Sequence, residues 1–522
     1  MNVLFETQSP TFLRLFDGAI RELVERGHRV TLQIWNADSV ERPSAELASV
    51  ADRIEVRRGR PRRHDSWAAL ATLLRETLDY VRYLDSRLEA GYLRERRDRL
   101  PRALGPLRGV ERLGPRSMGV LLRVGLALER AIPSAPAVER LLASAAPDVV
   151  VTTPLVVRPD HTDVVKSARA LGIPTALAVA SWDHLTTKGL IREQPDRVLV
   201  WNQVQAREAV ELHLYPPDRI RVTGAHSFDR WFEQEPSTTR EGFCARAGLD
   251  PDRPFVLWAG SSRMISPAPV EHPFVLRWME ALRRAGDAEV ADLGILVRPH
   301  PDNRDYWSAL DVPPLENVAL WRPHAEYAMV DADARREFFD SLFHCAAVVG
   351  INTSAMIEAA IVGRPVLTVR PEDFADTQGA TLHFRYLLPE NGGFLLAADG
   401  LGEHVAQLAE VLRAPEPGAA LRARFVASFV RPQGEEVTGS VLLADAIEET
   451  ACQRPVGAAD GPGTRLLRAA MRPAAAGLDP SSAGLRRRSS RALRRGVRRG
   501  RRVARRRLRT AELFVRGAKD GL

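Results

Sequence analysis

Cysteine is scarce in this sequence, and several short enzyme motifs do not occur in it. The 522 residues include three cysteines, Cys244, Cys345 and Cys452, which lie far apart and form no CxxC pair. This argues against a disulfide scaffold and against a thiolate zinc site. No GxGxxG follows an expected strand, and neither a P-loop GxxxxGKS/T nor HExxH occurs, so the dinucleotide, P-loop and zinc-protease signatures are lacking.

Long apolar stretches are also missing. The longest candidate, residues 346–362, contains Asn352, Thr353, Ser354 and Glu358, so it is not expected to span a bilayer. The first residues, MNVLFETQ, have the pattern of a β-strand and not that of a signal peptide. We therefore expect a cytoplasmic protein, and peripheral binding to the inner face of the membrane remains open.

Charge is distributed unevenly along the chain. The formal net charge is +8, from 74 Lys plus Arg and 66 Asp plus Glu. Residues 456–522 hold 19 basic and 4 acidic residues, whereas residues 1–455 hold 55 basic and 62 acidic residues. The sequence therefore predicts a mildly acidic body with a strongly basic C-terminal tail. A body of this length exceeds the size of a single core, so two domains are expected.

The basic tail is densest in residues 485–509, which contain 14 arginines and no acidic residue. Leu493, Val497, Ala504 and Leu508 recur there at a spacing that fits one helical face. Such a segment favours an anionic membrane surface as its partner. A solvated disordered tail and nucleic-acid binding by counterion release are the alternatives. Few aromatic residues accompany the arginines, so no specific nucleic acid is expected.

Strand and helix patterns alternate through the body. Short apolar runs rich in β-branched residues, each followed by a helical pattern, predict parallel sheets covered on both faces. We expect an α/β fold of two doubly wound Rossmann-like domains that face a cleft. The first would span residues 1–235 with a helical insertion at about 66–145, the second residues 236–454, and the Arg-rich linker and tail residues 455–522. The expected strands are 3–8, 30–35, 148–153, 174–181, 197–201, 220–223, 254–258, 294–298, 317–321, 346–350 and 365–369.

The most informative segment is VVGINTSAMIEAAIVGRPVLTV, residues 348–369. A buried strand is followed by the small polar residues Asn352, Thr353 and Ser354 and then by a short helix that carries Glu358. The free N–H groups and the dipole at the start of that helix would suit a phosphate or diphosphate. The Glu358 carboxylate would accept hydrogen bonds from ribose hydroxyls. The alternative is that Thr353 or Ser354 only caps the helix and that Glu358 is solvated.

This segment resembles the donor-nucleotide motif of GT-B-fold enzymes. That superfamily includes nucleotide-sugar glycosyltransferases, UDP-N-acetylglucosamine 2-epimerases and CDP-glycerol glycerophosphotransferases. The resemblance covers roughly residues 1–452, without the insertion and the tail. It implies that Asn352, Thr353 and Ser354 contact the donor diphosphate and that Glu358 holds the ribose. It points to the superfamily and does not select a reaction within it.

Two further polar loops follow expected strands of the second domain. In AGSSR, Gly260 and Ser261 would let the backbone approach a phosphate, and Arg263 would neutralise its charge. In RPHPDN, Arg298 and His300 are similar to the Arg/His-Pro segments that GT-B enzymes place near the nucleotide. A solvated turn is the alternative for each loop taken alone.

A third polar loop, FADTQGATLHF, follows the last expected strand. Glycosyltransferases of the GT-B fold often hold the donor sugar with an Asp/Gln pair at this place. The resemblance therefore implies that Asp376 and Gln378 contact the donor sugar, with His383 nearby.

In the first domain, the most informative segment is SWDHLTTKG, residues 181–189. Asp183 or His184 would deprotonate an acceptor hydroxyl, because an inverting transfer needs a general base near the reacting carbon. Lys188 would meet a phosphate or the acceptor. The alternative is that Asp183 caps a helix and His184 faces solvent. Glu6 and Gln8, after the first expected strand, form a second candidate loop on the acceptor side.

The sequence gives little support for a metal or a cofactor. Asp331-Ala332-Asp333 spells a DxD motif, but it opens a helical pattern, so we interpret it as a helix cap. We predict metal-independent chemistry without a resident cofactor, in which the nucleotide-diphosphate donor is a substrate.

Three functions remain open. The first is a glycosyltransferase that moves a sugar from a nucleotide-diphosphate donor to a hydroxyl of a cell-envelope glycan or lipid-linked acceptor. The second is a CDP-glycerol-type glycerophosphotransferase. The third is a non-catalytic GT-B-like binding protein. An epimerase is less favoured, because the further acid/base residues that it would place in the first domain have no match.

Overall fold

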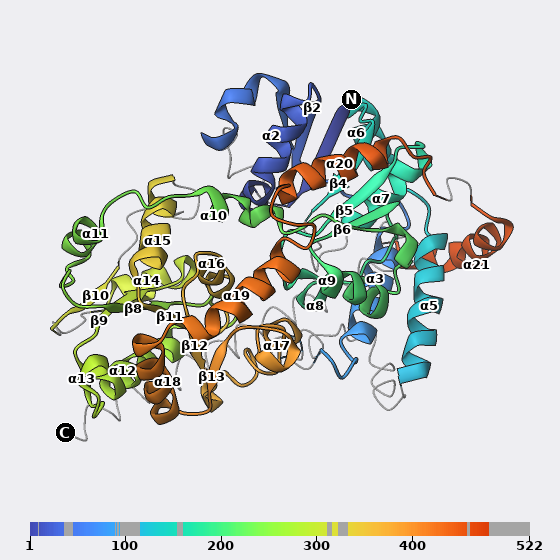
Figure 1. Cartoon of the computed structure of the whole chain (residues 1–522). Coiled ribbons are helices and arrows are strands. Elements are labelled where there is room, and N and C mark those ends of the chain that lie inside the picture. The colour runs from blue at the N-terminus through green and yellow to red at the C-terminus, as the bar shows by residue number, and fades with distance from the viewer. Residues whose placement is uncertain are drawn as a thin grey trace.

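Two parallel β-sheets organise the described part of the chain (Figure 1). The computed structural model describes residues 1–8, 10–35, 45–88, 90, 93, 115–153, 160–310, 316–321, 332–456 and 460–479. Each sheet with its helices forms one Rossmann-like half of the molecule.

Among the described residues, the first sheet has seven strands in the order β3-β2-β1-β4-β5-β6-β7, all parallel. Val3 and Phe5 point into one buried cluster and Leu4 into another, so both faces of β1 are covered. The strands are β1 (Asn2–Thr7), β2 (Arg29–Ile34), β3 (Ile54–Arg58), β4 (Val149–Thr152), β5 (Thr175–Ala178), β6 (Arg197–Val200) and β7 (Ile220–Val222).

The helical segments of the first half connect these strands and cover the sheet. The α-helices are α1 (Pro10–Leu13), α2 (Asp17–Glu25), α3 (Ala68–Arg82), α5 (Pro115–Ala131), α6 (Pro136–Ala145), α7 (Asp160–Ala170), α8 (His184–Thr187), α9 (Gln203–His213) and α10 (Asp229–Glu233). The shorter 3₁₀ segments are η1 (Arg14–Phe16), η3 (Ala45–Arg53), η5 (Pro217–Arg219) and η6 (His226–Phe228).

Within the described residues, the second sheet has six parallel strands in the order β10-β9-β8-β11-β12-β13. The chain reverses direction across the sheet between β8 and β11, and ligands of doubly wound sheets bind at such a switch point. The strands are β8 (Phe255–Ala259), β9 (Gly294–Arg298), β10 (Val318–Leu320), β11 (Ala347–Gly350), β12 (Val366–Val369) and β13 (Leu396–Ala398).

The helical segments of the second half include the short helix α16, which follows the central strand β11. The α-helices are α11 (Arg240–Ala247), α12 (Ala268–Arg283), α13 (Ala288–Ala291), α14 (Arg304–Ser308), α15 (Ala332–His344), α16 (Ala355–Ile361), α17 (Leu382–Arg385), α18 (Leu401–Arg413), α19 (Ala419–Phe425), α20 (Gly439–Ala451) and α21 (Pro462–Leu478). The remaining turns are η7 (Pro301–Asn303), η8 (Glu372–Phe374), η9 (Pro389–Asn391), η10 (Glu416–Gly418) and the π-helical η11 (Val426–Val430).

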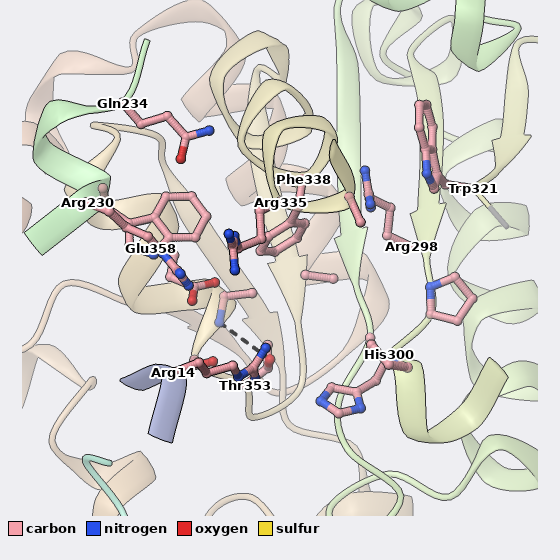
Figure 2. Close-up of a pocket in the computed structure, with 18 residues that line it drawn as sticks. Arg14, Arg230, Gln234, Arg298, His300, Trp321, Arg335, Phe338, Thr353 and Glu358 are labelled. Carbon is pink, nitrogen blue, oxygen red and sulfur yellow. Dashed lines mark hydrogen bonds between the residues drawn. The ribbon is translucent and has the colours of Figure 1, made fainter. Parts of the chain in front are cut away.

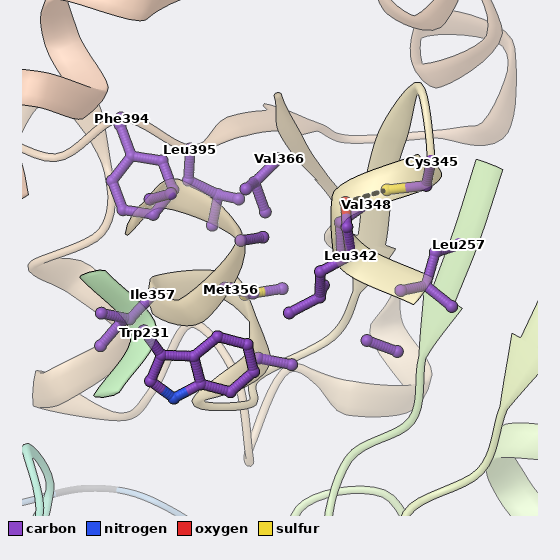
Figure 3. Close-up of a cluster of buried hydrophobic side chains, with 14 of the residues drawn as sticks. Trp231, Leu257, Leu342, Cys345, Val348, Met356, Ile357, Val366, Phe394 and Leu395 are labelled. Carbon is purple, nitrogen blue, oxygen red and sulfur yellow. Dashed lines mark hydrogen bonds between the residues drawn. The ribbon is translucent and has the colours of Figure 1, made fainter. Parts of the chain in front are cut away.

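A large apolar cluster joins the two halves. It contains Trp201 and Trp231 from the first half and, from the second, one buried face of β8 and β11 together with buried side chains of α16. Figure 3 shows Trp231 beside Met356 and Ile357 of α16. Because α16 is anchored on this core, Thr353 and Ser354 before the helix and Glu358 in its first turn have fixed positions.

The predicted fold class is confirmed, with differences at three places. Strands β3 and β13 were missed, since β3 reads IEVRR at the sheet edge and β13 has three residues. Helix α20, predicted within the second domain, buries its apolar side chains in the core of the first sheet against α2. Helix α6, predicted within the insertion, packs with α7 against one face of the first sheet, beside Leu4 of β1 and Val150 of β4.

The segment predicted as linker and tail begins with a helix. Helix α21 packs against α3 and α5 through Met471 and Ala475, beside Trp67 and Ile132. No helix in the part of the chain that the structure describes is both long enough and apolar enough for a membrane span. The arginine-rich residues 485–509 lie outside the described residues.

Candidate functional site

A pocket lies between the carboxyl ends of β8, β9 and β11 and the segments η1 and α10 of the first half (Figure 2). It encloses about 910 Å³, the solvent at its mouth included. Residues predicted to bind a donor nucleotide line it, namely Gly260, Arg298, His300, Thr353, Ser354 and Glu358. Side chains that were not predicted complete the wall, among them Arg14, Arg230, Trp231, Gln234, Trp321, Arg335 and Phe338.

Three arginines reach toward Glu358 from different elements, as Figure 2 shows. Arg14 comes from η1, Arg230 from α10 and Arg335 from α15. Burial, and then the charges of Arg230 and Arg335, lower the pKa of Arg14 to about 10. Asp17 and Glu358 offset part of the repulsion on Arg14, and a phosphate-bearing ligand would add further compensating charge to the cluster.

Glu358 faces the three arginines from the first turn of α16 (Figure 2). Burial raises the pKa of Glu358 to about 7, and the charges of Arg230 and Arg14 oppose this rise. The carboxyl is therefore a hydrogen-bond acceptor whose charge changes near neutral pH.

Thr353 and Ser354 line the pocket at the start of α16. The Ala355 N–H donates to Thr353 Oγ1 at 3.4 Å, which is a weak cap. The Ser354 side chain makes no capping hydrogen bond. The capping alternative therefore accounts for Thr353 in part and does not account for Ser354.

The loop after β8 places one residue in the pocket wall and the next in the protein interior. Gly260 lines the pocket, and a Cβ there would lie 2.6 Å from the His300 N and 3.0 Å from Pro299 Cα. Ser261 is fully buried, where its N–H donates to Glu271 and its hydroxyl accepts from the Asn352 N–H. Ser261 therefore supports the loop from behind.

Arg263 does not reach this pocket. Its side chain is exposed and it is absent from the lining. The expectation that Arg263 neutralises a phosphate in the pocket has no geometric support, because the chain turns outward after Ser261. The arginines in the lining are instead Arg14, Arg230, Arg298 and Arg335.

Arg298 and His300 form the opposite wall. The Arg298 guanidinium stacks on Trp321 and Phe338 at 4.8 and 5.3 Å and donates to the Glu337 carbonyl and the Ser341 hydroxyl. Burial lowers the pKa of Arg298 to about 10.

His300 uses one ring nitrogen within its own loop. Its Nδ1 accepts a hydrogen bond from the Asp302 N–H at 3.1 Å. Burial lowers the pKa of His300, Asp302 opposes that effect, and Arg14 adds to it. A neutral imidazole is thus favoured on the wall opposite Glu358.

Asn352 and Gln378, predicted to touch the donor, are buried structural groups. Asn352 Nδ2 donates to the Thr377 carbonyl and contacts His383 Nε2 at 3.2 Å. Gln378 Nε2 donates to the Ile351 and Val369 carbonyls and to a threonine hydroxyl. The predicted sugar contact of Gln378 is not supported, because its amide nitrogen ties the ends of β11 and β12 together.

Asp376 and His383 lie apart from each other. Asp376 is exposed and is not in the pocket lining. His383 is buried, and its ring meets the edge of Trp182 from the first half at 4.8 Å. Burial lowers the pKa of His383 to about 4. The loop after β12 thus touches the segment predicted to hold the catalytic base.

The predicted catalytic residues lie in that interdomain contact. Asp183 accepts hydrogen bonds from the Ser181 and Thr187 hydroxyls at 2.6 and 2.9 Å. Burial disfavours its charge, but Lys188 and His184 hold the pKa of Asp183 below its usual range. Burial lowers the pKa of His184 to about 4.

Neither residue has the proton affinity of a good general base at neutral pH. His184 is 3% exposed, so the alternative in which it faces solvent is wrong. Asp183 occupies the cap position of α8 but makes no capping hydrogen bond through its side chain. Lys188 is half-buried beside them and supplies a positive charge.

Glu6 and Gln8 end the first strand. Gln8 is half-buried, whereas Glu6 is 1% exposed. One Glu6 carboxyl oxygen accepts from Trp35 Nε1, and the other contacts His161 Nδ1. Glu6 is therefore a fixed interior carboxyl at the carboxyl edge of the first sheet.

The DxD motif shows no metal arrangement among the described residues. Asp331 lies outside them, and Asp333 on α15 pairs with Arg336. Across the described ranges, no group of three or more His, Cys, Asp and Glu side chains is placed to hold a metal ion.

Sequence reasoning missed the arginine cluster. Arg14 follows the first strand, Arg230 precedes the linker and Arg335 lies inside a helix, so no short motif unites them. The three arginines share only their position in the folded protein, where Arg14 and Arg230 of the first half lie beside Arg335 of the second. This proximity can be recognised only once the two halves are placed together.

Two Rossmann-like halves with a pocket between them define a GT-B-type fold. Solved structures that the chain resembles include UDP-GlcNAc 2-epimerase from Neisseria meningitidis bound to UDP-GlcNAc, at 12% identity and a TM-score of 0.46, over 86% of this chain and 99% of that chain. A putative UDP-N-acetylglucosamine 2-epimerase from Listeria monocytogenes has 12% identity and a TM-score of 0.48, over 85% and 94%. WaaG, a glycosyltransferase involved in lipopolysaccharide biosynthesis, has 13% identity and a TM-score of 0.42, over 85% and 99%.

Identity and TM-score are low in each case, so the fold class rests on the two parallel sheets of this chain. Comparison with protein-family models found no match, and comparison with curated protein sequences found none either.

Proposed function

We propose that this protein is a metal-independent GT-B-type glycosyltransferase. It binds a nucleotide-diphosphate sugar in the pocket around Glu358 and transfers the sugar to a hydroxyl of a cell-envelope glycan or lipid-linked acceptor. The observation that carries the proposal is the convergence of Arg14, Arg230 and Arg335 on Glu358 in one pocket between the two halves.

The charges in this pocket fit the parts of such a donor. A diphosphate needs several donors of positive charge, and guanidinium groups bind phosphate oxygens in pairs. A ribose needs an acceptor for its hydroxyls, which the Glu358 carboxylate supplies when it is ionised. Trp321 and Phe338 add apolar surface to the wall on the side of Arg298 and hold its guanidinium in place.

The same charges assist the departure of the leaving group. As the bond from the sugar carbon to the diphosphate oxygen breaks, negative charge grows on the diphosphate. Arginines held in place beforehand stabilise that charge without reorganisation. This role requires no divalent cation, which is why the proposal is metal-independent.

The experiment is a thermal-shift and calorimetry screen with UDP, GDP, CDP, TDP and CDP-glycerol. We expect one nucleoside diphosphate to raise the melting temperature clearly and Glu358→Ala to abolish that response. Asp373→Ala, a change of an exposed carboxylate outside the pocket, is the control and should keep it. A response to CDP-glycerol alone would favour the glycerophosphotransferase. If no nucleotide binds, the donor site does not exist and a non-catalytic protein is favoured.

A separate proposal concerns residues 485–509, which the structure does not describe. Their 14 arginines are expected to hold the protein on an anionic membrane surface, near a lipid-linked acceptor. Flotation with vesicles containing phosphatidylglycerol should retain the full chain and release a chain ending at residue 479. Equal flotation of both chains would reject the membrane role.

A further inference from the structure

Glu358 stands between two sides of the donor pocket. On one side, Figure 2 shows Arg14 next to Thr353, and Ser354 follows in the lining. Gly260 adjoins them, because the residue after it is hydrogen-bonded to the residue before Thr353. A guanidinium, hydroxyl groups and a glycine that lets the backbone approach are suited to phosphate oxygens. The diphosphate of the proposed donor therefore belongs on this side, with its ribose at Glu358.

Gln234 lies on the other side of Glu358, beyond Arg230 (Figure 2). Helix α10 packs against α16, which brings Arg230 to Glu358. Gln234 follows four residues after Arg230, so it lies about one helical turn further along the same face. Its backbone is held in place, because its N–H donates to the Arg230 carbonyl at 3.0 Å. The half-buried side chain lines the pocket.

The Gln234 amide is available to a ligand. It is the one carboxamide in the pocket lining that the structure describes, and it makes no hydrogen bond to another described residue. The cations nearby are already engaged. Arg298 donates to a backbone carbonyl and a serine hydroxyl and stacks on two aromatic rings. Arg230 and Arg335 reach toward Glu358 (Figure 2).

A nucleoside diphosphate is built in the order of these groups, with the phosphates first, the ribose next and the base last. With the ribose at Glu358, the base extends toward Gln234. Each base presents hydrogen-bond donors and acceptors side by side on its edge. A carboxamide offers one donor group and one acceptor, so it can form a pair of hydrogen bonds with a base.

We propose that Gln234 reads the base of the donor nucleotide and determines which nucleoside diphosphate the protein prefers. This inference rests on the proposed transferase function. Gln234 is the last residue of the α10 turn, and the chain then crosses through residues 235–239 to α11 of the second half. The base therefore contacts the segment that joins the two halves.

The first test separates the base from the phosphates. Calorimetry on the full chain measures the Kd of UDP, CDP, GDP, ADP and inorganic diphosphate. We expect Gln234→Ala to weaken binding of the preferred nucleoside diphosphate by about 10-fold and to leave inorganic diphosphate, which has no base, unchanged. Gln203→Ala is the control, since Gln203 is exposed on α9 and does not line the pocket. It should alter neither Kd.

The second test changes the specificity. A carboxylate only accepts hydrogen bonds, and guanine presents two N–H donors side by side on its edge. We therefore expect Gln234→Glu to raise the affinity for GDP relative to the affinity for UDP by about 10-fold.

The outcomes separate this inference from the proposed function. An unchanged Kd of the preferred nucleotide in Gln234→Ala would overturn the assignment. So would an equal loss for inorganic diphosphate, because the residue would then be only structural, or an unchanged ratio of GDP to UDP affinity in Gln234→Glu. These results leave the donor site intact, whereas a wild-type chain that binds no nucleotide defeats the proposed function and this inference with it.

Discussion

Replacement of Arg14 by methionine should change stability and ligand affinity in opposite directions. Arg14 is the contribution of η1 to a pocket built mostly from the second half. The lowering of its pKa to about 10 means that the folded protein holds this charge at a cost. That lowering corresponds to roughly 3 kcal/mol, of which burial is the largest cause and the charges of Arg230 and Arg335 follow.

Methionine keeps most of the length of the side chain and removes the charge. The gain is reduced because Arg14 also interacts favourably with Asp17 and Glu358. We therefore expect Arg14→Met to stabilise the ligand-free protein by about 1 kcal/mol. A nucleoside diphosphate would lose one charge-assisted hydrogen-bonding group, a loss of about 1.5–3 kcal/mol or roughly 10- to 150-fold in Kd.

Denaturant unfolding without ligand and calorimetry with the nucleoside diphosphate measure the two effects. Arg21→Met is the control, because Arg21 is exposed on α2 and does not line the pocket. It should alter neither quantity appreciably. If Arg14→Met lowers stability and leaves the Kd unchanged, the arginine is a structural group and the anion-binding interpretation of the cluster is refuted.

Other predictions concern the same pocket and the first half. Burial raises the pKa of Glu358 to about 7, so nucleotide affinity should increase from about pH 6 to pH 8, while the ligand-free protein, which favours the protonated form, loses stability as pH rises from about 4.5 through about 7. Glu358→Gln should remove both pH effects, which calorimetry and unfolding measure at each pH for the wild type and the variant. The titration of the ligand itself is the same for both proteins, so it cancels in the comparison. Gly260→Ala places a Cβ 2.6 Å from a backbone nitrogen and should cost about 1–3 kcal/mol in unfolding and weaken nucleotide binding, unlike Gly286→Ala, which meets open space. Glu129→Ala should cost about 3 kcal/mol because it takes one of two carboxylate partners from each of the buried cations Arg75 and Lys166, whereas Glu280→Ala on the surface should cost less than about 0.5 kcal/mol. A change below 1 kcal/mol for the buried residue would show that water reaches this network.

The sheets could be predicted because their strands are buried on both faces. Such strands appear as continuous apolar runs, for example FVLWA in β8 and GILVR in β9. The missed strands lack this signal: β3 is an edge strand with three charged residues out of five, and β13 reads LAA. The return of α20 to the first sheet could not be predicted either, because an amphipathic helix does not specify which of two cores buries its apolar face.

The residues of the candidate site also differ in how well the sequence predicts them, because some follow a local motif and others depend on contacts with distant segments. Thr353, Ser354 and Glu358 follow one buried strand within eight residues, so a local motif was sufficient to bring them to the pocket. Gln378 was misassigned because a polar residue after a strand can face either the solvent side or the strand ends, and here it binds the strand ends. Sequence pattern does not resolve that choice.

The arginines were missed for a compositional reason as well. Arginine supplies nearly all of the 74 basic residues, so one more arginine in a helix carries little information. What distinguishes Arg14 is that it lies eight residues after Glu6, in the segment that leaves β1. If the proposed donor site is correct, this segment of the first half supplies a charge that binds the leaving group. A shift of the first half relative to the second would then move Arg14 away from Glu358. Affinity for the nucleotide would therefore depend on how the two halves are placed.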